Sequence, residues 1–196
     1  MVDGLLISTE IVLYESGTLN DSKYATIGVV HLRYRPMPAK IATRRSAIHG
    51  NGVFAIAPIR KGERLIEYKG RHRTHKEVDR VYADDVDTGH TFLFTLNETY
   101  VIDANVGGNA ARWINHSCDP NCEAVLVEDD DEDPARDAVF IEAMRAIKPG
   151  EELTYNYGIV LAEAHTERLK KLWACRCGSP KCTGTMLQPK PAKKSR

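Results

Sequence analysis

Long apolar runs and a surplus of either charge are absent from this sequence. Its 27 Lys and Arg residues balance 27 Asp and Glu residues, so the formal net charge of the 196-residue chain is zero. We therefore expect no global attraction to nucleic acid or to an anionic membrane, and any electrostatic effect must be local. The longest apolar stretches, residues 27–30 and 124–127, are far shorter than the roughly 20 residues that cross a bilayer. The sequence thus predicts no transmembrane helix and no membrane partner.

The chain also has few cysteines, and their number and spacing bear on its compartment. Five are present, of which Cys175, Cys177 and Cys182 form a CxCxxxxC cluster around the turn-forming residues 178–180. This spacing is typical of a metal site rather than a disulfide framework, with free thiols on a loop as the alternative. No basic segment followed by a continuous apolar one opens the chain, so we expect no cleavable secretion signal. Both observations predict an intracellular, reducing environment, and Cys122 is expected to be a small buried apolar side chain.

Apolar patterns and turn residues predict one β-rich domain with an N-terminal appendage. Residues 1–37 contain two apolar, β-branched runs that predict accessory strands, and prolines then separate them from the rest of the chain. No internal repeat is evident. We expect helices in residues 74–82, 109–114 and 162–173, and strands in residues 122–127 and 137–143 joined by the six acidic residues 128–133. Composition alone therefore indicates an α+β domain that is mostly β.

Four blocks of the chain resemble the SET-domain protein lysine methyltransferases that carry a post-SET zinc tail. The longest and most specific is the string Asn-His-Ser-Cys-Asp-Pro-Asn at residues 115–121, which contains Cys118. The four blocks follow the family's order between residues 38 and 187, and they are residues 49–55, 112–121, 150–158 and 175–182. The segment around residues 175–187 looks closest to the trithorax-like members.

This resemblance implies a SET fold of small curved sheets around a C-terminal pseudoknot, with a small zinc-binding post-SET segment. In such a pseudoknot the segment ending at Tyr157 passes through the loop that carries Asn115 and His116, a rare kind of threading. The implied domains are residues 1–37 as N-terminal accessory strands, 38–158 as the SET domain, 159–187 as the post-SET helix and zinc segment, and 188–196 as a basic tail.

The resemblance also implies an activity, the transfer of a methyl group from S-adenosylmethionine to a lysine amine. Tyr157 falls at the family's catalytic tyrosine position, where the hydroxyl orients the amine and the departing methyl group. Tyr155 falls at a position where the hydroxyl of a tyrosine limits how many methyl groups fit, which predicts mono- or dimethylation. Tyr155, Tyr157, Phe92 and Phe94 supply the aromatic lining that a channel for a neutral lysine needs.

The family pattern further implies which residues hold the cofactor and the metal. The predicted S-adenosylmethionine contacts are His49, Asn51, Gly52, Phe92, Arg112, Asn115, His116 and Tyr157. The predicted structural zinc is held by Cys118 together with Cys175, Cys177 and Cys182, and four thiolates leave no open position for chemistry. For Arg112, support of the fold is an equal alternative to a cofactor contact.

Some residues depart from the family pattern. Phe92 replaces a frequent tyrosine, Asn156 replaces a common aspartate, Arg71 stands where a glutamate is frequent, and Trp113 replaces a phenylalanine. The missing Phe92 hydroxyl leaves the number of methyl groups open, and a SET-fold binding module with weak or no turnover is one alternative function. A methyltransferase for a non-histone protein is the other.

The expected partner is a protein with a flexible basic segment that contains the target lysine, above all a histone tail. Nucleic acid is then expected only indirectly, through nucleosomes. A histone substrate predicts a nuclear or chromosome-associated protein, and another substrate would leave it cytoplasmic. The sequence leaves the oligomeric state open.

Overall fold

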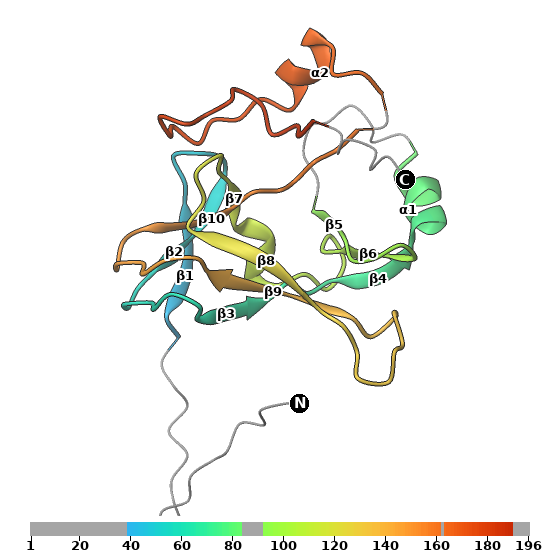
Figure 1. Ribbon diagram of the computed structural model, residues 1–196, viewed down its shortest axis with the longest axis horizontal. Helices are drawn as coiled ribbons and strands as arrows, with labels where there is room; N and C mark the ends of the chain where they lie inside the picture. The colour runs from blue at the N-terminus through green and yellow to red at the C-terminus, as the bar shows by residue number, and fades with distance from the viewer. Residues whose placement is uncertain (1–38, 84–91, 162, 190–196) are drawn as a thin grey trace, which may run out of the picture. The chain divides into compact units, whose positions relative to one another are not determined.

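A computed structural model describes residues 39–83, 92–161 and 163–189 (Figure 1). The chain divides between Met37 and Pro38 into two units, and every described residue belongs to the second unit. The predicted accessory strands of residues 1–37 and the end of the basic tail therefore lie outside the described residues. Within the described ranges, no helix has the length and the apolar character that a membrane span requires.

Within the described residues, ten short strands form three small sheets, which confirms the predicted α+β fold with mostly β structure (Figure 1). The first sheet has the order β1 (Ile41–Arg45), β2 (Asn51–Ala55), β10 (Glu152–Tyr155) and β7 (Asn115–His116). The second has the order β3 (Arg64–Glu67), β9 (Ala138–Ala143) and β8 (Cys122–Val127). The third has the order β4 (Arg71–Thr74), β6 (Tyr100–Asp103) and β5 (Leu93–Thr95).

Alternating burial along the strands builds the core between these sheets. In β9 the buried residues are Val139, Ile141 and Ala143, and their neighbours are partly exposed, as expected when successive side chains point to opposite faces. Ile102 and Leu153 from the other two sheets are also fully buried. Each such side chain contributes about 2 kcal/mol through removal of its apolar surface from water. Cys122 belongs to this core, which confirms its predicted place.

One parallel pairing brings distant parts of the sequence together. Thr154 pairs with Asn115 and Tyr155 pairs with His116, whereas every other pairing between the named strands is antiparallel. The predicted threading requires these two segments to lie side by side. The pairing therefore places the block that ends at Tyr157 directly against the block that begins the Asn-His-Ser-Cys string.

The helices are short and lie near the predicted positions. Helix α1 (His75–Val81) begins after Thr74, which forms a capping box with Glu77, and a single 3-10 turn (Ala110–Trp113) follows Asn109. Helix α2 (Glu167–Leu172) is shorter than the predicted 162–173. It begins after Thr166, whose side chain accepts the Leu169 N–H, and this cap fixes its first turn.

Two turns of matching sequence, residues 60–63 and 148–151, lie next to each other. The residues before them, Ile59 and Ile147, exchange backbone hydrogen bonds of 3.0 Å. The third residue of each turn is a glycine with a positive φ, +74° and +92° respectively, which glycine adopts without steric strain. The fourth is a glutamate that accepts the N–H of the first residue, at 3.1 and 2.7 Å. These turns form a short internal repeat, although none was expected from the sequence.

Asp103 anchors the third sheet through a buried charge. Its carboxylate is fully buried and accepts hydrogen bonds from Arg73 at 2.7 Å, from the Tyr82 hydroxyl at 2.9 Å and from the Asn105 N–H at 3.0 Å. Burial alone would favour the protonated acid, but these donors outweigh it and hold the pKa of Asp103 below its ordinary range.

We predict that Asp103→Asn lowers the free energy of unfolding by about 2 kcal/mol, because it removes the partner of a largely buried guanidinium. Because the folded-state pKa is depressed, the contribution of Asp103 is present above its unfolded pKa and is lost as the pH falls through the folded-state value. Urea denaturation at neutral and acidic pH measures both effects. Asp79→Asn, on the exposed face of α1, is the control, and equal stability of the two variants would contradict the prediction.

Candidate active site and cysteine cluster

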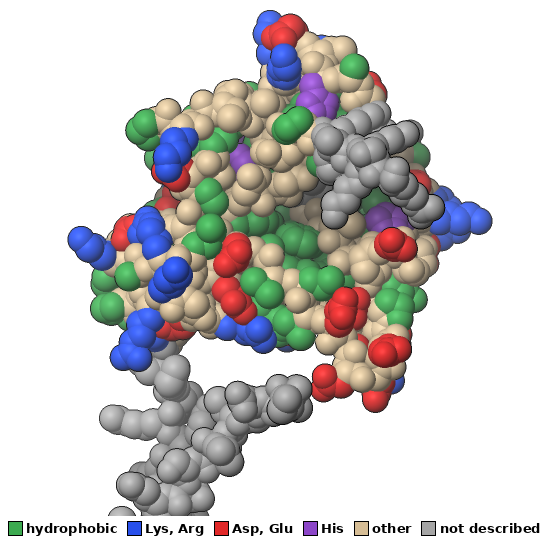
Figure 2. Space-filling model, in the orientation of Figure 1, with side chains coloured by type: hydrophobic (Ala, Val, Ile, Leu, Met, Phe, Trp, Pro, Cys, Tyr) green, Lys and Arg blue, Asp and Glu red, His purple; other side chains and the backbone are tan. Residues whose placement is uncertain are grey.

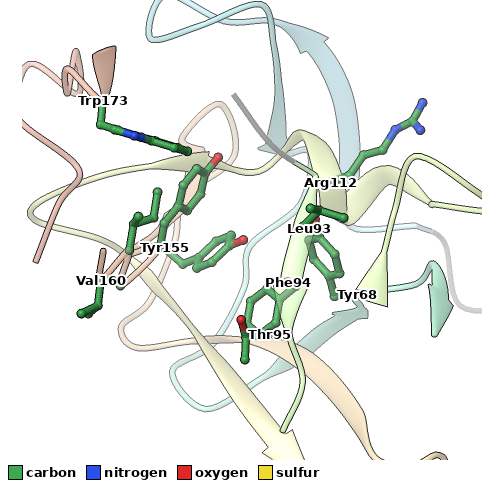
Figure 3. Close-up of a pocket in the computed structure, with 11 residues that line it drawn as sticks. Tyr68, Leu93, Phe94, Thr95, Arg112, Tyr155, Val160 and Trp173 are labelled. Carbon is green, nitrogen blue, oxygen red and sulfur yellow. The ribbon is translucent and has the colours of Figure 1, made fainter. Parts of the chain in front are cut away.

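A cavity of about 430 Å³ opens where the parallel pairing meets strand β5 and the C-terminal segment (Figure 3). The aromatic rings of Tyr68, Phe94 and Tyr155 gather at its centre, and Trp173 lies on the other side of Tyr155. A cavity of this size lies within the range of small-molecule and side-chain sites. Its lining consists of Tyr68, Leu93, Phe94, Thr95, Arg112, Tyr155, Tyr157, Gly158, Ile159, Val160 and Trp173.

The aromatic rings form a connected wall. Ring centroids are 5.2 Å apart for Tyr68 and Phe94, 6.2 Å apart for Phe94 and Tyr155, and 4.9 Å apart for Tyr155 and Tyr157. Such a wall excludes water while leaving three hydroxyl groups as polar contacts. Tyr68 was not among the predicted site residues, because a single tyrosine after an ordinary strand carries no signal of its own. The Tyr68 hydroxyl donates to the carbonyl oxygen of Phe92 at 3.3 Å.

Tyr157 is held at both its backbone and its side chain. Its hydroxyl donates to the carbonyl oxygen of Ile114 at 2.9 Å, and its N–H donates to His116 Nδ1 at 3.2 Å. Burial raises the pKa of Tyr157 and of Tyr155 well above the ordinary value for a tyrosine. Both phenols are therefore neutral near pH 7, so they can form hydrogen bonds but carry no charge.

Asn115 joins the turn before β2 to strand β10. Its Nδ2 atom donates to the carbonyl oxygens of His49 at 3.2 Å and Asn51 at 2.9 Å, and to Glu152 Oε1 at 2.8 Å. These three acceptors fix the orientation of the amide, so Oδ1 must point the other way. Among the described residues, no donor contacts Asn115 Oδ1.

Gly52 permits a close approach between this turn and Glu152. A Cβ atom at Gly52 would overlap the Glu152 carboxylate, which the Ser46 hydroxyl and the Asn115 amide hold in place. The φ of Gly52 is not positive, so the requirement is one of space. The space beside Gly52 is thus filled by the Glu152 side chain in this structure.

Arg112 contacts mainly its own neighbours. Its Nη1 donates to the carbonyl oxygen of Ala104 at 3.0 Å, and its guanidinium lies 4.5 Å from the ring centre of Trp113 and 5.4 Å from that of Phe92. In Figure 3 the guanidinium points away from the other labelled side chains. Its Nε is buried and has no hydrogen-bond partner in the described part of the chain. These contacts support the fold.

Four cysteines from two distant segments meet beside this site. The Sγ atoms of Cys118, Cys175, Cys177 and Cys182 all lie within 4.8 Å of one another, and those of Cys118 and Cys175 are 3.7 Å apart. Four sulfurs at about 2.3 Å from a tetrahedral zinc would be about 3.8 Å apart, so the cluster has the donor set and the spacing of a structural zinc site. The four cysteines could therefore bind a zinc ion, as predicted.

The thiols of this cluster differ in their environment. Burial raises the pKa of Cys175. At Cys177 burial acts in the same direction, but the backbone N–H groups of Cys118 and Ser179 outweigh it, and the pKa falls to about 6. A thiolate at neutral pH is the form that binds a metal ion. Outside the cluster, burial raises the pKa of Cys122 to about 12, which keeps it a thiol.

His116 lies between the cysteine cluster and Tyr157. Its Nε2 is 3.6 Å from the Sγ of Cys118, and its Nδ1 accepts the Tyr157 N–H. Burial lowers the pKa of His116 to about 4, so the ring is neutral near pH 7. With Nδ1 as an acceptor, the ring proton resides on Nε2, facing the sulfur.

The C-terminal segment closes one side of the cavity. Trp173, at the end of α2, lines the cavity two residues before Cys175. The segment returns along the domain through backbone bridges of Ala174 with Thr185 and of Ile159 with Leu187. Any ion that holds the cysteines together would therefore also hold Trp173 in place.

Residues 50–158 match the family model described as "SET domain". The chain belongs to the SET-domain family. This shows the predicted family, and the small sheets with few helices agree with it.

Two curated relatives and one solved structure are similar to this SET domain. The chain is 36% identical over 156 residues to "Histone-lysine N-methyltransferase, H3 lysine-4 specific" of Debaryomyces hansenii. The matched region covers 78% of this chain and 13% of the relative. It is 35% identical over 162 residues to "Histone-lysine N-methyltransferase trithorax" of Drosophila virilis, which covers 82% of this chain and 4% of the relative.

The solved structure is a humanized mutant of the Chaetomium thermophilum Polycomb Repressive Complex 2 bound to an inhibitor. It matches with a TM-score of 0.53 and 34% identity, over 60% of this chain and 15% of that chain. This chain thus spans a small part of the length of each of these proteins.

The structure brings most of the predicted SET-site residues together. Tyr155, Tyr157 and Arg112 line the cavity. The side chain of Asn115, in strand β7, donates to the backbone of His49 and Asn51. Phe92 is placed differently from the predicted channel wall. It packs edge-on against Trp113 at 5.0 Å, outside the cavity lining that Phe94 provides.

Two of the departures from the family pattern have a clear structural place. The Asn156 side-chain oxygen accepts the Gly158 N–H at 3.0 Å, so the amide serves as the acceptor in this turn. Arg71 is exposed on β4.

Proposed function

We propose that this SET domain is an S-adenosylmethionine-dependent protein lysine N-methyltransferase that acts on a histone tail. The observation that carries the proposal is the aromatic cavity in which the Tyr157 hydroxyl is held by Ile114. The curated relatives are named histone-lysine N-methyltransferases, which supports both the reaction and the substrate class.

The residues at the site fit the proposed cofactor. Methyltransferases of this family use S-adenosylmethionine, whose amino-acid end carries an ammonium group and whose sulfur is positively charged. The Asn115 carbonyl oxygen is an acceptor without a donor among the described residues, which suits an ammonium group. The aromatic faces of Tyr155 and Tyr157 suit a neighbouring cation. Asn115, His116 and the turn with His49, Asn51 and Gly52 would hold the cofactor from one side, and the Tyr157 side chain would face it from the other.

The bound cofactor supplies a methyl group attached to a positive sulfur, and the protein must present a neutral amine to it. A free lysine has a pKa of about 10.4, so deprotonating it at pH 7 costs roughly 4 to 5 kcal/mol. The ring wall of Tyr68, Phe94 and Tyr155 lowers this cost, because it removes water that would stabilise the ammonium form. The proton leaves to solvent before transfer.

The Tyr157 hydroxyl aligns the reacting groups. Because burial raises its pKa, the phenol stays protonated near pH 7 and supplies no phenolate base, and its O–H is committed to the Ile114 carbonyl oxygen. The lone pairs of the phenol oxygen remain available, and they orient the amine and the departing methyl group. Methyl transfer needs no nucleophile from the protein, because the lysine amine itself attacks the methyl group. The protein therefore speeds the reaction by aligning the reacting groups and excluding water.

Zinc has a structural role in this proposal. Four thiolates close the coordination sphere, so the ion takes no part in methyl transfer. Bound zinc would hold the C-terminal segment against Cys118 and so keep Trp173 on the cavity. We propose mono- or dimethylation, on the basis of the Tyr155 hydroxyl, and a nuclear, chromatin-associated setting that follows from the histone substrate.

We predict that Tyr155→Phe raises the number of methyl groups added to each lysine. Loss of the Tyr155 hydroxyl removes a polar group from the cavity wall and leaves room for a methylated amine to turn. We expect trimethyllysine to become a main product, with the first transfer slowed less than about tenfold. Mass spectrometry of a tail peptide at completion measures this shift. Phe94→Leu is the control for altered packing, and an unchanged product distribution in Tyr155→Phe would contradict the assignment.

An acceptor panel tests the proposed substrate class. Core histones, free histone-tail peptides and a histone-depleted protein extract are incubated with labelled S-adenosylmethionine. The proposal predicts label on lysines of histone tails. Label only in the depleted extract would indicate a non-histone substrate, and cofactor binding without any transfer would indicate a binding module.

A further inference from the structure

Basic and acidic side chains are unevenly distributed over the face that Figure 2 shows, although the formal net charge of the 196-residue chain is zero. Figure 2 shows Lys and Arg side chains gathered at the left of the view, where Figure 1 places β1 and the loops around β3. Acidic side chains gather at the lower right, where the β8–β9 hairpin ends. We call the first region the basic surface, and it comprises Lys40, Arg60, Lys61, Arg64, Arg145 and Lys148.

The matching turns 60–63 and 148–151 build the centre of this surface. Each begins with a basic residue, Arg60 in one and Lys148 in the other, and the backbone bridge before the turns holds them side by side. Lys61 is a second basic residue within the first turn. All three bases are exposed.

Three acids of the surface are engaged in ion pairs, whereas the exposed Glu123, opposite Glu142 in the β8–β9 ladder, offsets one basic charge. Glu63 pairs with Lys40 at 2.6 Å, Glu142 with Arg64 at 2.9 Å and Glu151 with Arg145 at 2.7 Å. Glu63 and Glu151 also accept a backbone N–H of their own turn. The bonds from Lys40 and Arg145, and then these backbone bonds, hold the pKa values of the two glutamates below the ordinary range. The surface therefore keeps an excess of positive charge on Arg60, Lys61 and Lys148, which have no ion-pair partner among the described residues.

The basic surface is far from the acidic hairpin. The β8–β9 ladder runs from the Cys122–Ala143 pair, next to the basic turns, to the Val127–Ala138 pair, next to the acidic residues. Five steps along a strand correspond to about 17 Å, which exceeds the screening length of about 8 Å at physiological salt. The acidic residues therefore do not cancel the potential of the basic surface.

The basic surface is also separate from the cavity. Strand β3 begins at Arg64, on the basic surface, and is followed by Tyr68, in the cavity wall. Four residues of extended chain span about 13 Å. A polyanion on the basic surface would thus leave the cavity accessible to a peptide.

We infer that the basic surface binds the phosphate backbone of duplex DNA, without reading its sequence. Arg and Lys side chains on exposed turns are the groups that contact phosphates, and turns place no helix or strand in a groove. Three unpaired bases predict a plot of log affinity against log salt concentration with a slope of about −3. The inference goes beyond the proposed function, and on a nucleosome it would let the domain contact DNA while the cavity takes a tail.

The test is fluorescence anisotropy with a short DNA duplex of random sequence, at several salt concentrations and without S-adenosylmethionine. The test variant combines Arg60→Glu with Lys148→Glu. The matched control combines Lys76→Glu with Arg80→Glu on α1, which changes the net charge by the same amount on exposed side chains elsewhere. A neutral variant, Arg60→Gln with Lys148→Gln, covers the case in which the glutamates disturb folding.

We expect the wild-type domain to bind the duplex, and the test variant to bind it at least about tenfold more weakly. In the test variant, the slope of log affinity against log salt concentration should also be less negative by about 2. The control should bind as the wild type does. Equal losses in test variant and control, or no binding by the wild type, would overturn the inference. So would binding to labelled polyglutamate in place of DNA, since that would indicate an acidic protein partner. Methylation of a free tail peptide should change less than about twofold in the test variant, so failure here is distinct from failure of the proposed activity.

Discussion

The Tyr157→Phe variant is expected to transfer methyl groups at least about 100-fold more slowly than the wild-type SET domain, because it lacks the one phenol oxygen held by Ile114 at the cavity. The ring stays, so the packing against Tyr155 and His116 is preserved. The loss should therefore fall on kcat, with the KM for S-adenosylmethionine changed less than about threefold. Initial rates with a saturating tail peptide measure both constants.

Tyr100→Phe is the matched control for loss of a tyrosine hydroxyl. Tyr100 is partly buried in β6, outside the cavity lining, so its variant should keep the wild-type kcat. A wild-type kcat in Tyr157→Phe would show that another group orients the amine. In that case the Tyr68 hydroxyl, on the opposite part of the ring wall, would be the next candidate.

Removal of zinc is expected to abolish activity and to loosen the C-terminal segment together. Cys177→Ser removes one of the four sulfurs, and we expect its zinc content to fall from about one ion per chain to near zero. Trp173 then loses its anchor at the cavity, so methyl transfer should fall below about 1% of the wild-type rate. Elemental analysis, limited proteolysis within residues 173–187 and the transfer assay measure the three effects.

Cys122→Ala separates the role of the metal from that of cysteines in general. Cys122 is fully buried in the core away from the cluster, so its variant should keep zinc and most of its activity. Full activity in zinc-free Cys177→Ser would contradict the proposed structural role. So would loss of activity while residues 173–187 keep their protection from proteolysis.

Much of the fold and site could be predicted from local sequence. The strands 122–127 and 138–143, the capped helix after Thr74 and the Tyr155–Tyr157 pair carry their own signals of alternation, capping and motif. Cys118 as the fourth member of the cysteine cluster needed the family resemblance, because it is distant in sequence from the other three.

The remaining features depend on long-range contacts. Tyr68 and Trp173 join the cavity only because β3 and the C-terminal segment end there, which no local pattern records. Glu152 has the sequence of an ordinary strand residue, yet it fixes the Asn115 amide and excludes any side chain at Gly52. Phe92 was expected in the channel, but the Trp113 ring and the Arg112 guanidinium provide a packing site for it outside the lining.

The most direct test of the account is transfer of labelled methyl groups from S-adenosylmethionine to core histones and free histone tails. Wild type, Tyr157→Phe and a chelator-treated sample that is later resupplied with zinc are compared. The account predicts label on a histone lysine with the wild type, loss of label in both altered samples, and recovery only when zinc is returned. Measurable cofactor binding with no transfer to histones by the wild type, or equal transfer by Tyr157→Phe, would contradict it.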